Sequence, residues 1–159
     1  MIERICYMDG MFVYESEMRV SVYDLSVAQG AAAFTMTRSF NKQHFKLPEH
    51  IARLKQSCEL LSIPLPEDFE KLPSLIERMT EANESAFGPG EEYRMMWVVS
   101  PGTSRMYAEI PGTIPHSWMY GTMFPLRYTV QGFSKYFLDG VHCVTSQIQQ
   151  VPDACVPSA

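Results

Sequence analysis

The segment from Tyr93 to Val99 (YRMMWVV) carries large side chains at nearly every position. Successive side chains of a β-strand point to opposite faces, so a strand that is bulky on both faces belongs inside a sheet that is covered on each side. The segment therefore predicts a central strand in a layered protein. Other segments of the chain are then expected to form the neighbouring strands and the helices that cover the sheet.

Two hairpins are predicted before this strand. Residues 4–14 place apolar and aromatic runs on either side of Asp9-Gly10, a pair suited to a type I′ turn. The second hairpin combines Thr35–Phe40 with His44–Leu47 around the turn Asn41-Lys42-Gln43. These runs provide candidate neighbours for the central strand.

The stretch Ser21–Arg38 (SVYDLSVAQGAAAFTMTR) connects the two hairpins. In it, Gly30 is followed by three alanines and then by a strand-like run that ends in Arg38. Small residues before a strand indicate that the backbone packs closely against another group at this point.

Two amphipathic helices follow. Pro48 suits the first turn of a helix, and its core stripe is expected to comprise Ile51, Leu54, Cys58 and Leu61. A second helix is expected from Phe69 or Pro73 to Asn83, with a buried stripe of Leu72, Leu75, Ile76 and Met79. Strands, then two helices, then strands again predict an α+β domain that extends to about residue 128.

The last third of the chain is less regular. Ser100–Pro115 reads as a long loop, and Trp118–Val130 reads as a strand or a strand pair. We expect an N-terminal small domain over residues 1–128, a linker over 129–135 and the beginning of a second, truncated domain over 136–159. A strand is expected at Val141–Ile148.

Composition excludes several classes of function. The formal net charge of −5 leaves no basic stripe for nucleic acid, and no apolar stretch reaches membrane-spanning length. The N-terminus MIERICYMDG lacks the apolar run of a signal peptide, and the four cysteines show no CxxC spacing, so a cytoplasmic location is expected. The four histidines are equally dispersed, and no metal site is expected.

Three arginines are candidates for chemistry. Arg53 lies off the core stripe of its helix, where it could pair with Glu49 or bind a phosphate or carboxylate. Arg94 shares a strand face with Met96 and Val98, so it requires an anionic partner, which could be an internal acid or a ligand. Phe34 and Arg38 share one face of their strand. Phe34 could belong to the core or to a pocket wall, Arg38 reads as a surface residue of the strand, and Tyr93 could equally be a packing residue.

Four segments together resemble the class IV (fold type IV) pyridoxal-phosphate aminotransferases, which include branched-chain and D-amino acid aminotransferases and aminodeoxychorismate lyases. The matching segments, in the family's order, are CYMDGMFV (6–13), VSVYDLSVAQGAAAFTMTR (20–38), FKLPEHIARLKQSCELLSI (45–63) and EYRMMWVVSPG (92–102). The resemblance implies the N-terminal α/β sandwich domain of such an enzyme, followed by the start of its second domain.

The resemblance also implies roles for individual residues. Arg53 would bind the phosphate of pyridoxal 5'-phosphate, while Phe34, Arg38, Tyr93 and Arg94 would contact the substrate. Two departures alter the expected pocket lining: Gln29 stands where a tyrosine is common, and Thr35-Met36-Thr37 replaces the Glu-Gly-Ile of branched-chain enzymes.

The implied function is transfer of an amino group between an amino acid, with branched-chain amino acids as one candidate class, and a 2-oxo acid. A homodimer is expected, with the active site near the subunit interface. The Schiff-base lysine would follow IQQVPDACVPSA (148–159), directly after Ala159, and no lysine of the chain holds that position. We therefore expect the chain to be the N-terminal piece of a longer enzyme, with no catalytic residue of its own. The alternatives are an aminodeoxychorismate lyase-like enzyme and a non-catalytic dimerisation or ligand-binding domain.

Overall fold

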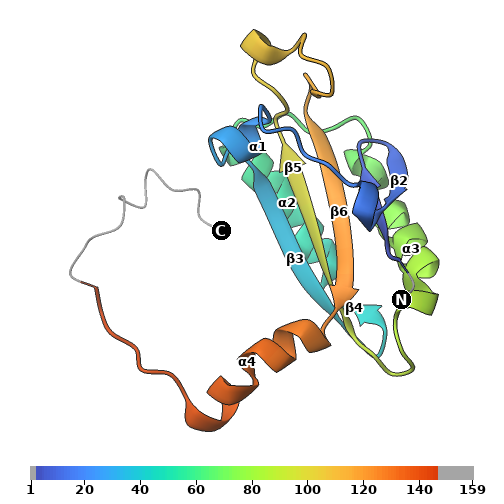
Figure 1. Cartoon of the computed structure of the whole chain (residues 1–159), viewed down its shortest axis with the longest axis vertical. Helices are drawn as coiled ribbons and strands as arrows, with labels where there is room; N and C mark the ends of the chain where they lie inside the picture. The colour runs from blue at the N-terminus through green and yellow to red at the C-terminus, as the bar shows by residue number, and fades with distance from the viewer. Residues whose placement is uncertain (1–2, 147–159) are drawn as a thin grey trace.

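The computed structural model describes residues 3–146 of the 159-residue chain (Figure 1). Its strands are β1 (Ile5–Met8), β2 (Met11–Tyr14), β3 (Ala33–Phe40), β4 (Gln43–His44), β5 (Tyr93–Ser100) and β6 (Trp118–Pro125). Its α-helices are α1 (Leu25–Ala28), α2 (Leu47–Leu60), α3 (Leu72–Asn83) and α4 (Arg127–Asp139). Short 3-10 turns are η1 (Glu15–Glu17), η2 (Phe69–Lys71), η3 (Glu84–Ala86) and η4 (Arg105–Tyr107).

The six strands form one antiparallel sheet in the order β2-β1-β6-β5-β3-β4. β5 lies between β6 and β3, so the central strand predicted from Tyr93–Val99 is confirmed. β4 pairs with β3 only at Ser39 and Phe40, so among the described residues the outer edge of β3 has no neighbouring strand for most of its length.

Both predicted hairpins form. Asp9 and Gly10 have φ of 43° and 85°, the left-handed pair that a type I′ turn requires. In the second hairpin the turn is Asn41-Lys42, with φ of 50° and 64°. Its return strand is shorter than predicted, because Lys46 adopts a left-handed conformation and α2 begins at the next residue.

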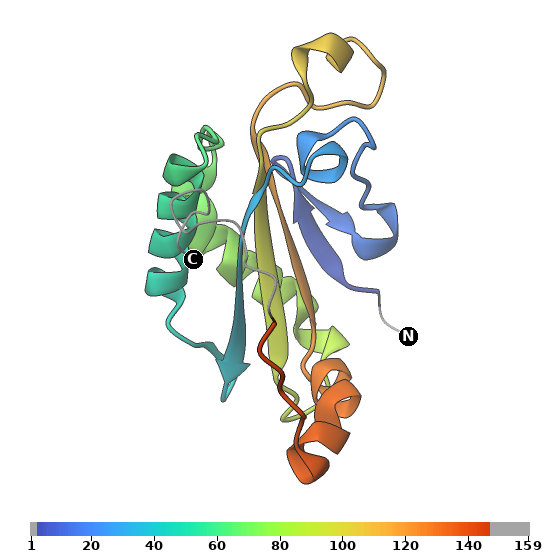
Figure 2. The same ribbon diagram turned by 90° about the vertical axis from the view of Figure 1, so that its left-hand side faces the viewer.

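Helices α2 and α3 cover one face of the sheet (Figure 2). The core between them and the sheet contains Leu54 and Cys58 from α2, the predicted α3 stripe, and the sheet residues Tyr7, Met95, Trp97, Val99, Met119 and Met123. Leu61, expected on the α2 stripe, is 40% exposed, because α2 ends at Leu60. Gly121 is required opposite Trp97, since a Cβ there would lie 2.6 Å from the indole ring.

Within residues 3–146 the opposite face of the sheet is covered only in part, which corrects the expectation of a layer on each side of β5 for this part of the chain. Val98 and Ser100 are buried, whereas Arg94 and Met96 are only half-buried. The segment that contains α1 covers this face at the C-terminal end of β5, near Ser100. At the other end of β5, Arg94 contacts Thr129 of α4 (Figure 2).

Asp24 anchors the covering segment. Its carboxylate is 1% exposed and accepts hydrogen bonds from the Ser26 amide at 2.8 Å, the Ser100 hydroxyl at 2.6 Å and the Trp118 indole at 2.8 Å. Burial raises the pKa of Asp24, but these hydrogen bonds outweigh it and bring the pKa below the ordinary value. A buried carboxylate therefore joins the α1 segment to the ends of β5 and β6.

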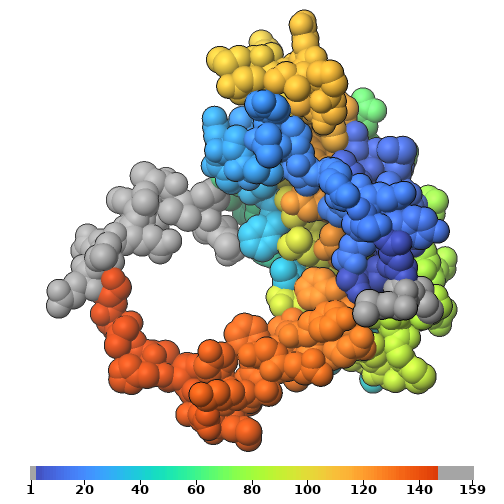
Figure 3. Space-filling model, in the orientation of Figure 1, coloured from blue at the N-terminus to red at the C-terminus, as the bar shows by residue number. Residues whose placement is uncertain are grey.

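Helix α4 corrects two expectations about the end of the domain. The chain is helical from Arg127 to Asp139, where a strand to Val130 and then a linker were predicted, and it extends from the foot of the sheet as an arm (Figure 3). Val130, Phe133 and Phe137 repeat at helical spacing and gather on one side of the helix. Residues 141–146 contain no strand, and the rest of the expected Val141–Ile148 strand lies outside the described residues.

None of the helices within residues 3–146 has both the length and the apolar character needed to cross a bilayer. Over the same residues, Cys6, Cys58 and Cys143 are free thiols, and burial raises the pKa of Cys6 and of Cys58 to about 11. The two buried thiols are therefore core residues with little nucleophilic character.

Candidate functional site

The half-covered face of the sheet carries the candidate residues, and we call it the open face. On β3 the side chains of Phe34, Met36 and Arg38 point to it, and their partners in register on β5 are Val98, Met96 and Arg94. Because directly paired residues of antiparallel strands lie on the same face, Arg38 and Arg94 are neighbours. The predicted shared face of Phe34 and Arg38 is confirmed.

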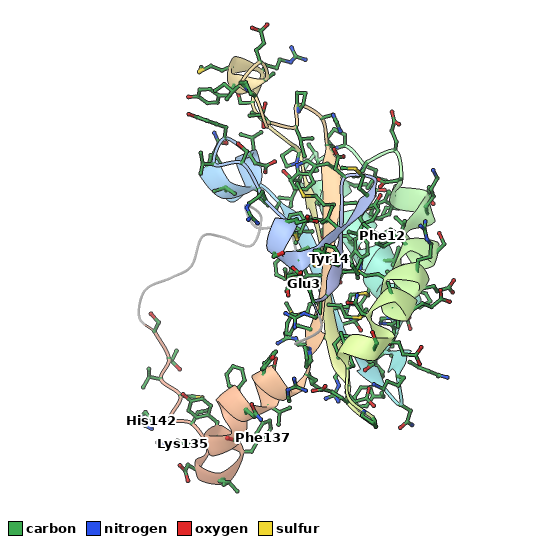
Figure 4. The ribbon with its side chains drawn as sticks, turned by 45° about the vertical axis from the view of Figure 1, so that its right-hand side comes forward. Glu3, Phe12, Tyr14, Lys135, Phe137 and His142 are labelled. Carbon is green, nitrogen blue, oxygen red and sulfur yellow. The ribbon has the colours of Figure 1, made fainter. Side chains whose placement is uncertain are left out.

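A hollow of about 500 Å³ lies where the open face meets α4, and we call it the arginine pocket. Its polar lining comes from Arg38, Arg94, His50, Thr37 and Thr129. Its apolar walls come from Met36, Phe45, Leu126, Val130, Phe133 and Phe137. Phe137 lies on the outer half of α4, beyond the body of the sheet (Figure 4).

Neither arginine of this pocket has an acidic partner within residues 3–146. Arg94 donates to the Thr129 hydroxyl at 3.1 Å, and Arg38 donates through Nε to the Ser39 carbonyl at 3.2 Å while its guanidinium lies over the Phe40 ring. The internal acid considered for Arg94 is therefore absent from this part of the chain. Two neighbouring cations with no acid between them favour a pocket for an anion.

Arg53 lies on α2, on the helix-covered side of β3. Its guanidinium donates to the Thr35 hydroxyl at 2.9 Å, and it forms no ion pair with Glu49, the alternative that spacing left open. The side chain is half-buried. A guanidinium with a neutral partner keeps its full charge for a ligand, so Arg53 suits a phosphate or a carboxylate.

His50 lies one helical turn before Arg53 and lines the arginine pocket. Its Nδ1 is 2.9 Å from the same Thr35 hydroxyl. Burial and the positive charge of Arg53 lower the pKa of His50, so the imidazole is neutral near pH 7. Thr35 thereby connects the pocket lining to Arg53.

Tyr93 is not brought together with the other candidates. Its side chain is 2% exposed on the helix-covered face, where it contacts His44 and Phe87 and donates to the Lys42 carbonyl at 2.7 Å. It borders a second hollow of about 430 Å³ on that face. The strand alternation that turns Arg94 to the open face turns Tyr93 away from it.

The residues of the two sequence departures lie in three different places in the structure. Met36 lines the arginine pocket on the open face, where the candidate Phe34 is 58% exposed, so both can meet a ligand. Thr35 and Thr37 are buried on the other face, with only Thr37 reaching the pocket at the edge of β3. Gln29 is exposed at the C-terminal end of α1.

Sequence reasoning missed His50, Thr35 and the apolar wall of α4. The i, i+3 spacing of His50 and Arg53 places both on one side of a helix, and period-two alternation places Thr35 on the buried face of β3. The spacing of Val130, Phe133 and Phe137 indicates a helix. The β-branched residues and the glycine of the same stretch have low helix propensity, so a helix was not predicted there.

Within residues 3–146 the candidate site therefore contains three arginines, Arg38, Arg53 and Arg94, that form no ion pair with an acid. Within residues 3–146 no cluster of His, Cys, Asp and Glu could hold a metal ion. The segment 148–159 and the lysine expected after it lie outside the described residues.

Comparison with known proteins supports the family resemblance of the four sequence segments. A model of the family described as Amino-transferase class IV matches residues 32–152, more than half of the chain. A protein of Methanocaldococcus jannaschii with the provisional name branched-chain-amino-acid aminotransferase is 32% identical over 77 residues, which cover 48% of this chain and 27% of the relative.

Solved structures share the fold. A branched-chain aminotransferase from Thermoproteus uzoniensis with norvaline superposes with a TM-score of 0.62 at 21% identity, over 77% of this chain and 41% of that chain. A hypothetical aminotransferase from Mycobacterium tuberculosis in its PLP-bound form superposes with a TM-score of 0.66 at 17% identity, over 82% and 43%. The chain thus spans about two fifths of the length of these structures.

Proposed function

Because this chain belongs to the class IV aminotransferase family, we propose that the protein is a pyridoxal-phosphate-dependent aminotransferase that moves an amino group between an amino acid and a 2-oxo acid. The observation that carries the proposal is the set of three guanidiniums of Arg38, Arg53 and Arg94. They lie around β3 and β5, and none has an acidic partner within residues 3–146. Phosphate and carboxylate are the groups that such guanidiniums bind.

Arg53 fits the phosphate of the cofactor. Its charge is uncompensated, and its partner Thr35 is neutral, so a phosphate dianion can form two aligned hydrogen bonds with the guanidinium. Pyridoxal phosphate, when bound, supplies an electron-accepting ring that stabilises negative charge at the substrate α-carbon. The role of Arg53 is to hold and orient the phosphate end.

Arg38 and Arg94 would receive the α-carboxylate of the substrate in the arginine pocket. The α4 wall of Val130, Phe133 and Phe137 would contact an apolar side chain, and Phe34 would border the entrance on the open face. The apolar wall and the names of the relatives support branched-chain substrates.

The intact protein would be a two-domain enzyme. In this proposal residues 1–128 form the small domain, α4 spans the proposed 129–135 boundary, and 136–159 begin the cofactor domain, which would supply the lysine and further phosphate ligands. A homodimer is supported by the exposed apolar side chains Val22, Tyr23, Met106 and Tyr107 at one end of the sheet. The free thiols agree with a cytoplasmic location.

Replacement of Arg53 tests the cofactor assignment. A hydrogen-bonded charge pair contributes about 1.5–3 kcal/mol, so Arg53→Ala should weaken pyridoxal-phosphate binding by roughly 10- to 150-fold. Arg53→Lys keeps the charge but loses the bidentate geometry and should give an intermediate loss. The dissociation constants can be measured from the absorbance of the bound cofactor in the intact protein.

An unchanged cofactor affinity in Arg53→Ala would remove the phosphate assignment. A screen of amino donors with the loaded wild-type protein then separates the reaction types. Transfer from several amino acids supports a transaminase, whereas cofactor binding without transfer supports a lyase, and no cofactor binding supports a non-catalytic domain.

A further inference from the structure

The hydroxyl of Thr35 has two nitrogen neighbours and almost no solvent. Thr35 is 3% exposed on the helix-covered face of β3, and its Oγ1 lies 2.9 Å from a terminal nitrogen of Arg53 and 2.9 Å from Nδ1 of His50. Both neighbours come from α2, three residues apart. The three side chains therefore form one short network that joins β3 to α2.

The available protons determine which atom donates and which accepts in each hydrogen bond of this network. The guanidinium can only donate, so Thr35 Oγ1 accepts from Arg53. The hydroxyl proton of a buried threonine needs an acceptor, and Nδ1 of His50 is the group in reach. His50 then carries its proton on Nε2 and is neutral, in agreement with the lowered pKa that burial and Arg53 give it.

The network controls the direction of the Arg53 side chain without reducing its charge. A carboxylate at position 35 would orient the guanidinium but would also neutralise it and compete with an anionic ligand. A hydroxyl orients the guanidinium while the positive charge remains available. His50 prevents rotation of that hydroxyl, because its Nδ1 is the acceptor for the proton.

We propose that Thr35 and His50 are positioning residues for Arg53, and that this neutral pair aims the guanidinium at the phosphate group of the cofactor. The proposal rests on the proposed function, since it requires that Arg53 binds phosphate. Thr35 acts only through Arg53 and touches no ligand. Thr35 itself does not line the arginine pocket, unlike its neighbours Met36 and Thr37.

Thr35→Val tests the pair in the intact protein, because valine has the shape of threonine without the hydroxyl. The expected result is a loss of pyridoxal-phosphate affinity of about fivefold, the size of one net hydrogen bond. Thr35→Ser keeps the hydroxyl and should remain within about twofold of wild type. His50→Phe should resemble Thr35→Val, whereas His50→Asn, which can accept at the position of Nδ1, should recover most of the affinity.

Three further measurements separate positioning from general damage to the fold. Pyridoxal without its phosphate should bind wild type and Thr35→Val equally, since the network acts only on the phosphate end. In an Arg53→Ala background, Thr35→Val should cause no additional loss of cofactor affinity. Nitrogen-15 NMR of His50 in wild type should report a neutral ring protonated at Nε2.

The outcomes distinguish the proposed phosphate contact of Arg53 from the positioning role of Thr35 and His50. If Arg53→Ala does not weaken cofactor binding, the proposed function loses its phosphate ligand. If Arg53→Ala weakens binding but Thr35→Val does not, the positioning role alone is wrong. The positioning role is also overturned if Thr35→Val weakens pyridoxal as much as its phosphate, if its effect persists without Arg53, or if His50 is protonated at Nδ1 in wild type.

Discussion

At the scale of single residues, we propose that Arg38 and Arg94 bind an external anion. Like charges at directly paired positions of antiparallel strands repel, and no acid within residues 3–146 forms an ion pair with either side chain. In the proposed function, the carboxylate of the substrate would supply the negative charge that these two guanidiniums lack.

Arg94→Met should therefore impair substrate binding more than folding. Methionine keeps the unbranched shape but loses the charge, so the KM for a 2-oxo acid should rise about tenfold or more. The free energy of unfolding without substrate should stay the same or increase, because the repulsion with Arg38 is removed. Steady-state kinetics and urea unfolding of the same variant measure the two effects.

Tyr93→Phe provides the matched control. It changes the adjacent residue of the same strand, but on the helix-covered face, where its hydroxyl donates to the Lys42 carbonyl. The variant should lose about 1 kcal/mol of stability and keep its KM. A tenfold rise in KM for Tyr93→Phe, or none for Arg94→Met, would contradict the assignment of the pocket to the open face.

At the scale of elements, Asp24 determines how the α1 segment lies on the sheet. Its carboxylate holds the Ser26 amide, the Ser100 hydroxyl and the Trp118 indole, which belong to three separate parts of the chain. The segment leads through Gly30 into β3, and so it sets the entry of Phe34 onto the open face. A single buried acid thus couples the covering segment to the strands that carry the site.

Asp24→Asn should destabilise the fold by about 2–3 kcal/mol at pH 7, because an amide nitrogen cannot accept the hydrogen bonds that a carboxylate oxygen accepts. The exposed Asp139→Asn, the same chemical change on α4, should stay within about 0.5 kcal/mol of wild type. Urea unfolding followed by circular dichroism measures both variants.

The effect of Asp24 should also depend on pH. The pKa of Asp24 is lowered in the folded state, so its stabilisation is complete above the unfolded value of roughly 3.9 and is lost as pH falls through the lower folded pKa. The stability difference between wild type and Asp24→Asn should therefore narrow in strong acid. A difference that is constant from pH 7 to strong acid would show that the carboxylate charge is not what stabilises this junction.

At the scale of the whole molecule, elements with a strong local pattern could be predicted from sequence. The Asp9-Gly10 turn, the α3 stripe and the central position of Tyr93–Val99 follow from local geometry and period. Arg38 and Arg94 were found as candidates, but their adjacency depends on the register of β3 with β5, which no local pattern gives.

The remaining features depend on tertiary context. Helix α4 has no fully buried residue and contains Thr129, Val130 and Gly132, so its weak intrinsic propensity predicted a linker. The role of Thr35 could not be read from its position in the strand, because its partners come from α2. Tyr93 was grouped with Arg94 by sequence proximity, and strand alternation separates them.

We propose that the open face belongs to an enzyme that transfers amino groups with pyridoxal phosphate. The most direct measurement follows nitrogen-15 from a labelled branched-chain amino acid to an unlabelled 2-oxo acid by NMR, with the intact, cofactor-loaded protein. We expect transfer of the label to the acceptor, abolished when the cofactor is removed and restored when it is added back. A protein that binds the cofactor but transfers no label from any amino acid to any 2-oxo acid would overturn the proposed activity.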